Sequence, residues 1–369
     1  MSYKILYIDD EDEQRSQTYA DGLSGLALVA ITIDKPTSYE KLINELVEKQ
    51  ELFDAIILDF KLDGNQKGDR VATYTAPSLA AGIRSKCFID DGFKKEFPIF
   101  LLSSSENLKK YYDPDSSSHD LFDFTINKIS IGEFGKKFEQ IIASIIKAYK
   151  NIYADKTAFA KILGVPSIEL VDDRIFSSRF LEGEDTSVSE ISQFIFQEII
   201  LKAGVLINQE VLAARLGVNF KESKDWHLLL ELLKDSAYSG VFSDAYSRWW
   251  SVDVMKWWNR SFNNIPLIRL GAKERVTLIK ERFNLNELVE ATKIDKATST
   301  KFWTICQAFK TPLDPKDGFL IDGLQKYSWQ DKKYLSLESL LERESFGKGF
   351  RLHPTERERF EELKKEYKS

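Results

Sequence analysis

Short apolar runs alternate with amphipathic stretches over the first 150 residues of the chain. The run at residues 53–58 is too short for a good helix and is rich in branched side chains, which favours a buried strand of a parallel sheet. Similar runs lie at 3–9, 26–33, 98–103 and 121–128, and helical spacing is clearest at 37–50 and 131–153. The alternation predicts an α/β fold with a doubly wound, parallel five-stranded sheet.

The remainder of the chain has a different pattern. From about residue 154 onward, apolar residues recur at helical spacing and strands are hard to place. We therefore predict two domains, an α/β domain at 1–150 and a mainly α-helical domain at 154–369. The long helix predicted at 131–153 would connect them.

Acidic residues stand at the ends of two predicted strands. Asp9 and Asp10 follow the first strand, and Asp59 ends the strand that begins near residue 55. The carboxyl ends of parallel strands form the ligand crevice of such sheets, so we expect the three carboxylates to lie within a few ångströms of one another. Like charges at that distance require a cation, and oxygen ligands of this kind suit Mg²⁺.

Two further polar residues end later strands. Ser103 follows the apolar run at 98–102, and Lys128 follows the run that begins at residue 121. Taken singly, an acidic pair can be a solvated loop, Asp59 or Ser103 a helix cap, and Lys128 a surface lysine. Together and in this order they are hard to obtain by chance, although the three serines at 103–105 leave the position of the hydroxyl open by one residue.

Residues 3 to about 150 resemble the receiver domain of response regulators in two-component phosphorelay signal transduction. The resemblance rests on five side chains in chain order: Asp9, Asp10, Asp59, Ser103 and Lys128. It implies a flavodoxin-like fold, and a phosphoprotein that accepts a phosphoryl group from a sensor histidine kinase or a phosphotransfer protein. A phosphatase of the haloacid dehalogenase kind is disfavoured, because it needs a second Asp two residues after the first, where this chain has Lys61.

The resemblance also implies a set of metal ligands. Asp10 would bind Mg²⁺ directly, and Asp9 would act largely through metal-bound water. Asp59 would be a ligand as well, and the backbone carbonyl of Lys61 would complete the protein ligands.

By the same resemblance, three residues carry the phosphoryl chemistry. Asp59 would be the nucleophile that forms an acyl phosphate, Ser103 would follow the phosphoryl group, and Lys128 would be its cationic partner. Two positions depart from the family pattern: Ile129 stands where a proline is common, and Thr125 stands where an aromatic switch residue is usual. A rotating aromatic ring is therefore not expected to transmit the signal.

No family resemblance extends to residues 154–369, but two segments within it suggest functions. The segment near 207–235 begins like a helix-turn-helix, yet its second helix at 222–231 is not basic, so an all-helical core is favoured over a DNA reader. The segment at 246–258 holds four of the seven tryptophans, and core packing is favoured there over a partner-binding surface.

The amino-acid composition argues against some classes of function but points to no further chemistry. The 369 residues are 43% hydrophobic and 30% charged, with a net charge of -6, which are ordinary globular values that do not favour DNA binding. The chain contains no run of 18 apolar residues, so neither a membrane span nor a membrane partner is expected. We therefore expect a cytoplasmic location. Cys87 and Cys306 lie far apart and are expected to be reduced thiols.

The sequence thus predicts a cytoplasmic signalling protein similar to a response regulator, phosphorylated on Asp59 with Mg²⁺. Its helical domain would act on an unidentified protein partner, and a homodimer is compatible with the sequence. Two alternatives stay open: a phosphate acceptor or scaffold without output activity, and a DNA-binding regulator that uses 207–235. Whether the chain is an enzyme also stays open, since nothing favours an activity beyond phosphoryl acceptance and autodephosphorylation.

Overall fold

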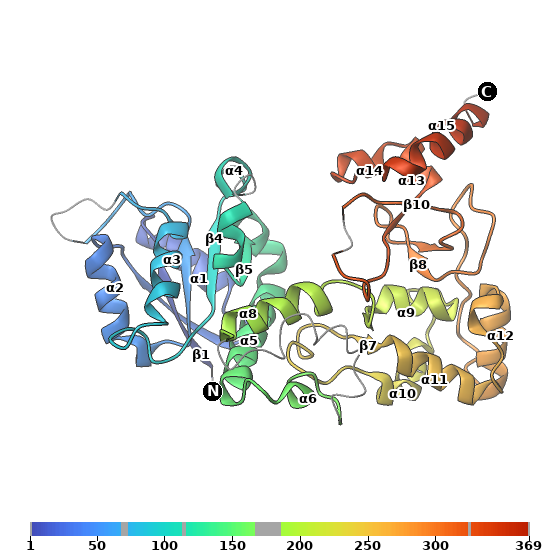
Figure 1. Cartoon of the computed structure of the whole chain (residues 1–369), viewed down its shortest axis with the longest axis horizontal. Helices are drawn as coiled ribbons and strands as arrows, with labels where there is room; N and C mark the ends of the chain where they lie inside the picture. The colour runs from blue at the N-terminus through green and yellow to red at the C-terminus, as the bar shows by residue number, and fades with distance from the viewer. Residues whose placement is uncertain (1, 68–72, 113–115, 167–185, 324–325, 368–369) are drawn as a thin grey trace. The chain divides into compact units, whose positions relative to one another are not determined.

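The computed structural model describes residues 2–67, 73–112, 116–166, 186–323 and 326–367 (Figure 1). The chain divides into two compact units. The first holds the described residues up to 166 together with 186–198 and 239–246, and the second holds 199–238 and 247–367. No helix in the described part of the chain is long and apolar enough to cross a membrane.

A parallel five-stranded sheet forms the centre of the first unit, as the alternation of apolar runs predicts. Its strands lie in the order β2-β1-β3-β4-β5, and every neighbouring pair is parallel. Their bounds are β1 (Tyr3–Ile8), β2 (Val29–Asp34), β3 (Ala55–Asp59), β4 (Ile99–Ser103) and β5 (Phe124–Asn127). All residues of β3 and β4 are buried, which explains why these two strands read as continuous apolar runs.

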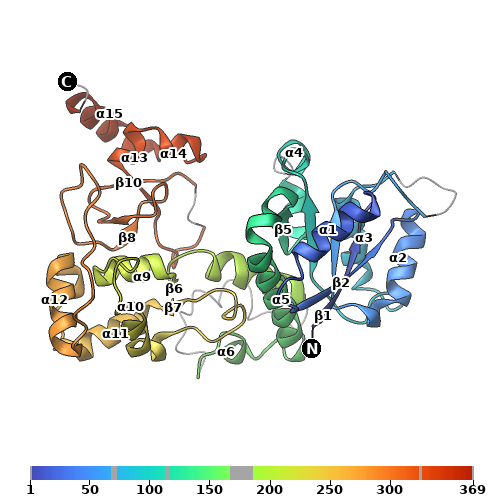
Figure 2. The same ribbon diagram turned by 180° about the vertical axis from the view of Figure 1, so that it is seen from behind.

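Helices cover both faces of this sheet. Their bounds in the first unit are α1 (Glu13–Gly22), α2 (Tyr39–Glu48), α3 (Ala76–Lys86), α4 (Ser105–Asn107), α5 (Ile131–Ala154), α6 (Phe159–Ile162) and α8 (Val188–Phe194). Helix α3 lies in front of the sheet in Figure 1, whereas α1 lies in front of it in the reverse view of Figure 2. Ile8, Ile56 and Leu58 pack in one core cluster with side chains of α2 and α3. Because side chains alternate along a strand, Tyr7 and Ile57 point to the opposite face.

Two glycines allow α1 to pack closely against α5. A Cβ atom on Gly135 would lie 2.2 Å from the carbonyl oxygen of Gly22, and one on Gly22 would lie 2.5 Å from Cγ2 of Ile131. Neither distance is compatible with a side chain, so these glycines fix how near the two helices come.

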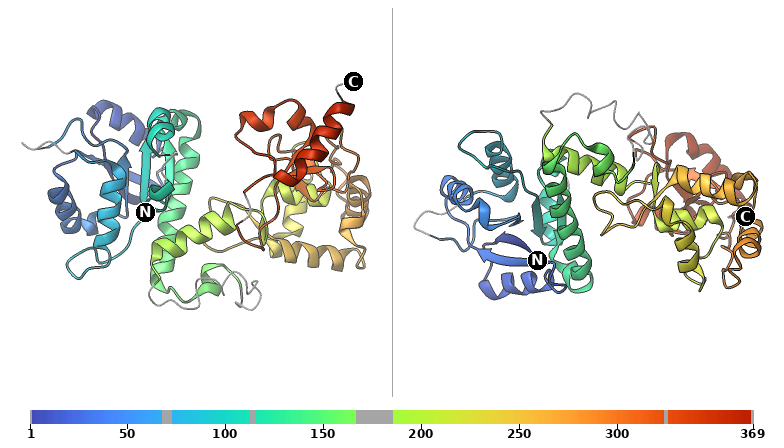
Figure 3. Two further views of the ribbon diagram at one scale, coloured as in Figure 1. Left: turned by 45° about the horizontal axis from the view of Figure 1, so that its top comes forward. Right: turned by 90° about the horizontal axis from the view of Figure 1, so that it is seen from below.

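Segments from later in the chain pack on α5 within the same unit. Helix α8 lies beside α5 (Figure 3). The ring of Phe196, just after α8, contacts the rings of Phe124 in β5 and Phe242. Asp244 accepts a hydrogen bond from Ser144 and pairs with Lys147, both on α5. The first unit is therefore assembled from separate stretches of the chain.

The second unit is not purely helical. Its helices are α9 (Gln209–Leu216), α10 (Trp226–Leu232), α11 (Ser251–Ser261), α12 (Ala272–Phe283), α13 (Leu337–Leu341), α14 (Glu344–Gly347) and α15 (Arg357–Glu366). Three antiparallel pairs accompany them: β6 (Leu206–Ile207) with β7 (Trp249–Trp250), β8 (Thr304–Ile305) with β9 (Pro312–Leu313), and β10 (Gly318–Leu320) with β11 (Tyr334–Ser336). The prediction of a mainly α-helical region is thus confirmed only in part, because strands of two or three residues carry no readable period.

The tryptophan-rich segment belongs to the core of the second unit. Trp249, Trp257 and Trp258 are buried in one cluster, and Trp258 donates its indole N–H to the carbonyl of Ile265 at 2.8 Å. The ring of Trp250, which is half-buried, packs edge-on against Tyr238. The prediction that this segment packs in a core is therefore confirmed.

The helix-turn-helix-like segment is also packed into that core. Residues 211–216 of α9 are buried, and the helix is capped by Gly217, whose φ of 73° lies in the left-handed region. A Cβ atom on Gly217 would lie 2.7 Å from the Cα of Ala272, so the glycine also permits close contact with α12. The next helix begins at Trp226 rather than near 222; it exposes Leu228 and Leu232 and contains no lysine or arginine.

Candidate functional site

Three buried carboxylates meet at the carboxyl edge of the parallel sheet. Ile8 pairs with Leu58, so Asp9 and Asp10 leave β1 where Asp59 ends β3. Carboxylate oxygens of the three residues lie within 4.8 Å of one another. The exposed fractions of Asp9, Asp10 and Asp59 are 0%, 8% and 4%. The proximity that the strand ends predict is therefore present, and the carboxylates are shielded from water.

Lys128 supplies the positive charge of this cluster. It follows β5 directly, is buried, and places its Nζ 3.0 Å from Oδ1 of Asp59. The same Nζ lies 3.2 Å from Oε1 of Glu11, a fourth carboxylate that the sequence argument did not single out. The ring of Tyr19 on α1 lies 4.9 Å from Nζ.

Of the three consecutive serines, Ser103 is the one with an uncommitted buried hydroxyl. It ends β4 one residue beyond Leu102, which pairs with Asp59, and its Oγ has no hydrogen-bond partner among the described residues. Ser104 accepts a hydrogen bond from the backbone N–H of Asn107 as the cap of α4, and Ser105 accepts one from the side chain of Asn127. The hydroxyl of Ser103 is thus free for a ligand at this edge.

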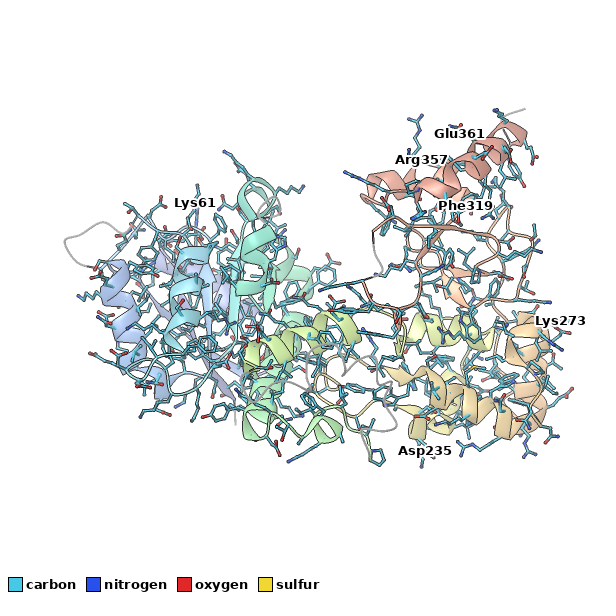
Figure 4. The ribbon with its side chains drawn as sticks, viewed as in Figure 1. Lys61, Asp235, Lys273, Phe319, Arg357 and Glu361 are labelled. Atoms are coloured by element: carbon cyan, nitrogen blue, oxygen red, sulfur yellow. The ribbon has the colours of Figure 1, made fainter. Side chains whose placement is uncertain are left out.

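The loop after β3 holds Asp10 in place. The backbone N–H of Gly64 donates to Oδ2 of Asp10 at 2.5 Å, and the N–H of Asn65 donates to its carbonyl at 3.0 Å. A Cβ atom on Gly64 would lie 2.8 Å from the same carboxylate oxygen. Lys61, in this loop, pairs its backbone with Thr75 and exposes its side chain (Figure 4).

Burial and charge shift the acidities at the site. Burial raises the pKa of Asp59 to about 7; the charge of Lys128 opposes the shift and that of Asp9 adds to it. The pKa of Asp10 is also raised by burial, against the N–H of Gly64. Burial alone would lower the pKa of Lys128, but the charges of Asp59 and Asp9 outweigh it, so the pKa is raised and the lysine stays charged.

The donor set fits Mg²⁺. Asp9, Asp10 and Asp59 are the only group of three acidic, histidine or cysteine side chains within ligand distance that the described residues contain. A few carboxylates plus water are the usual ligands of Mg²⁺. Buried polar atoms without a hydrogen-bond partner remain at the site, among them Oγ of Ser103 and Oε2 of Glu11. One lysine leaves the cluster with excess negative charge, which a divalent cation would neutralise.

Comparisons with known proteins find similarity only at the level of structure. No family model matches the chain, and a search of curated proteins finds no match. The match to a response regulator receiver domain protein from Clostridium thermocellum spans 41% of this chain and 98% of that protein, at 14% identity and a TM-score of 0.27. The phosphorylated cyanobacterial phytochrome response regulator RcpA covers 41% and 95%, at 16% identity and 0.26.

The RcsB response regulator of Salmonella typhimurium covers 36% of this chain and 55% of its own, at 17% identity and a TM-score of 0.23. Structural similarity to receiver domains thus spans about 40% of the chain, at its N-terminal end, and the C-terminal region is unmatched.

Proposed function

We propose that residues 1–150 are a receiver domain that is phosphorylated on Asp59 in a Mg²⁺-dependent way. The observation that carries the proposal is the buried cluster of Asp9, Asp10 and Asp59 at one sheet edge, with Lys128 3.0 Å from Asp59. An acidic cluster alone has many explanations. A buried lysine paired with the one aspartate that ends the central strand makes phosphoryl transfer the best account.

Each residue has a role that its position supports. Asp10 and Asp59 hold Mg²⁺ directly, Asp9 acts through water, and the Lys61 carbonyl adds a ligand. Bound Mg²⁺ would supply charge neutralisation for the carboxylates and the phosphoryl oxygens.

The transfer itself uses this chain's own side chains. An oxygen of Asp59 attacks the phosphorus of a phosphohistidine, the P–N bond breaks, and the imidazole leaves with a proton. Lys128 then pairs with the new phosphoryl oxygens, and Ser103 donates its hydroxyl hydrogen to one of them.

The donor that this chemistry requires is a sensor histidine kinase or a phosphotransfer protein. We further propose that residues 154–369 act as an output or interaction domain for a protein partner, which makes the whole chain a signalling protein of the response-regulator kind. The stretches 186–198 and 239–246 belong to this region by sequence but pack on α5 of the first unit. They are the physical link through which phosphorylation would act.

The first prediction is that Asp59 alone accepts the phosphoryl group. The full-length chain is incubated with a small acyl phosphate, with Mg²⁺ or with a chelator, and its intact mass is measured. The wild type should gain one phosphoryl group only with Mg²⁺, and Asp59→Asn should gain none. Asp63→Asn is the matched control, because Asp63 is an exposed carboxylate four residues away whose charge is only a minor influence on Asp10, so its labelling should match the wild type. Labelling of Asp59→Asn, or unchanged Mg²⁺ binding in Asp10→Ala, would show the assignment to be wrong.

A further inference from the structure

Two buried hydroxyl groups converge on one oxygen of Asp9. The phenol of Tyr7 and the hydroxyl of Ser16 each donate to Oδ2 of Asp9 at 2.7 Å. The other oxygen, Oδ1, accepts the backbone N–H of Glu11 at 3.1 Å. Tyr7, Asp9 and Ser16 have no exposed surface.

The two donors come from different elements. Tyr7 lies two residues before Asp9 at the end of β1, so both side chains emerge on the same face of the sheet. Ser16 lies in the first turn of α1, which begins at Glu13 because Asp12 accepts the N–H groups of Gln14 and Arg15. The helix cap therefore also sets where the hydroxyl of Ser16 points.

Counting lone pairs shows what remains of Asp9 for a ligand. A carboxylate offers about four acceptor positions, two on each oxygen. The hydroxyls of Tyr7 and Ser16 occupy both positions on Oδ2, and one backbone N–H occupies a position on Oδ1. Only one position on Oδ1 remains, and the three donors, from β1, from α1 and from the loop between them, prevent the carboxylate from rotating to offer another.

We propose that Tyr7 and Ser16 are positioning residues for the Mg²⁺ site. They hold Asp9 so that its remaining Oδ1 position faces Asp10 and Asp59, in an orientation suited to accept a hydrogen bond from metal-bound water. The inference rests on the proposed function of the cluster. It deepens that function, because groups that orient metal ligands from outside typically change metal affinity 10- to 100-fold when they are removed.

A purely structural role is the alternative that the test must separate. A buried tyrosine hydroxyl needs a partner wherever it lies, and Tyr149 has the same arrangement away from the site: it is buried and donates to Oδ1 of Asp123 at 2.6 Å. Tyr149→Phe is therefore a matched control for Tyr7→Phe. Each substitution removes one hydroxyl from a buried carboxylate and keeps the ring.

The experiment measures Mg²⁺ affinity by calorimetry in the full-length chain and thermal unfolding in the presence of a chelator. Tyr7→Phe and Ser16→Ala should each weaken Mg²⁺ binding about 10-fold, and Tyr149→Phe should leave it unchanged. Without Mg²⁺, Tyr7→Phe and Tyr149→Phe should lower the unfolding temperature by similar amounts. Ser16→Ala gives an independent measurement if Tyr7→Phe fails to fold.

The outcomes separate this inference from the proposed function. If the wild type binds Mg²⁺ and both Tyr7→Phe and Ser16→Ala bind it equally well, the positioning role is overturned and the proposed function stands. An equal loss of affinity in Tyr149→Phe would also overturn it, because the effect would then be general. A wild type that binds no Mg²⁺ overturns both proposals.

Discussion

At the scale of single residues, the charged form of the Asp59 carboxyl is destabilised by its surroundings, and a bound cation would remove that destabilisation. The carboxyl is buried beside Asp9 and Asp10, and its pKa rises from an ordinary value of 3.8 to about 7 against the opposing charge of Lys128. A raised carboxyl pKa means that the folded chain binds this proton more tightly than the unfolded chain does. In the absence of a cation, the group therefore costs stability as the pH rises from about 4 to about 7.

The second prediction follows from that sign. With a chelator present, Asp59→Asn should be more stable than the wild type at pH 8, by on the order of 1–4 kcal/mol, because each unit of pKa shift corresponds to about 1.4 kcal/mol. At pH 4 the difference should largely vanish, since Asp59 is then protonated when folded. Urea unfolding at both pH values measures it, with Asp63→Asn as control. A difference that does not depend on pH would contradict the pKa of Asp59.

The sequence reveals the charged members of this site but not the residues that hold them. Asp9, Asp10, Asp59 and Lys128 can be predicted because strand ends in a parallel sheet converge, whatever the details of packing. The role of Tyr7 cannot be predicted in this way, since a tyrosine in an apolar run is expected to be an ordinary core residue. Only the register of β4 and the bonds of its neighbours identify Ser103 among three serines.

At the scale of elements, the loop after β3 acts on the site through its backbone. Gly64 lies outside every predicted strand and helix, yet its N–H reaches Oδ2 of Asp10 at 2.5 Å, and a Cβ atom at this position would crowd the same oxygen. A backbone N–H is present in every residue type except proline, so sequence patterns give no sign of this contact. Here the only signal is the glycine itself, which permits the close approach.

The third prediction is that Gly64→Ala weakens Mg²⁺ binding without unfolding the chain. The added methyl group would meet the carboxylate oxygen of Asp10, which can move aside at little cost in stability but then leaves its place in the cluster. We expect affinity to fall roughly 10-fold, as measured by calorimetry. Gly25→Ala is the control, because no atom lies within 4 Å of the position of its Cβ. Equal affinities in the two variants would show that Asp10 does not depend on the loop.

Element length also explains why the strands of the second unit could not be predicted from the sequence. Its β strands are two or three residues long, and β7 is the Trp249–Trp250 pair at the start of a helical pattern. Period-based reasoning needs at least four residues to separate a strand from a helix. The amphipathic stretches of α11 and α12, in contrast, are long enough to be recognised.

At the scale of the molecule, helix α5 has contacts that no local pattern could reveal. Residues 186–198 and 239–246 join the first unit although they lie far along the chain, and each touches α5 or β5. Thr125 stands where the resemblance would place an aromatic switch residue, and its neighbour Phe124 contacts both Phe138 of α5 and Phe196. A shift of β5 or α5 would therefore directly change the contacts that these later segments make.

The last prediction is that phosphorylation changes the protection of α5 and the segments packed on it. When Ser103 and Lys128 both reach for a phosphoryl group, the ends of β4 and β5 move inward. Packed helices convert such small shifts into a choice between discrete arrangements. Hydrogen exchange with Mg²⁺, with and without fluoroberyllate, should therefore change at 103–112, at 131–153, at 186–198 and at 239–246. A coupling of about 1–3 kcal/mol would suffice for a useful response.

A matched variant tests whether α5 carries this change. Asp244→Asn removes the charge that pairs with Lys147 but keeps the size of the side chain, so exchange near the phosphorylation site should respond to fluoroberyllate as in the wild type. The response at 239–246 should shrink, because that stretch loses part of its hold on α5. If exchange in the wild type changes only around Asp59, the signal does not leave the pocket. The protein would then act as a phosphate acceptor or scaffold rather than as a switch.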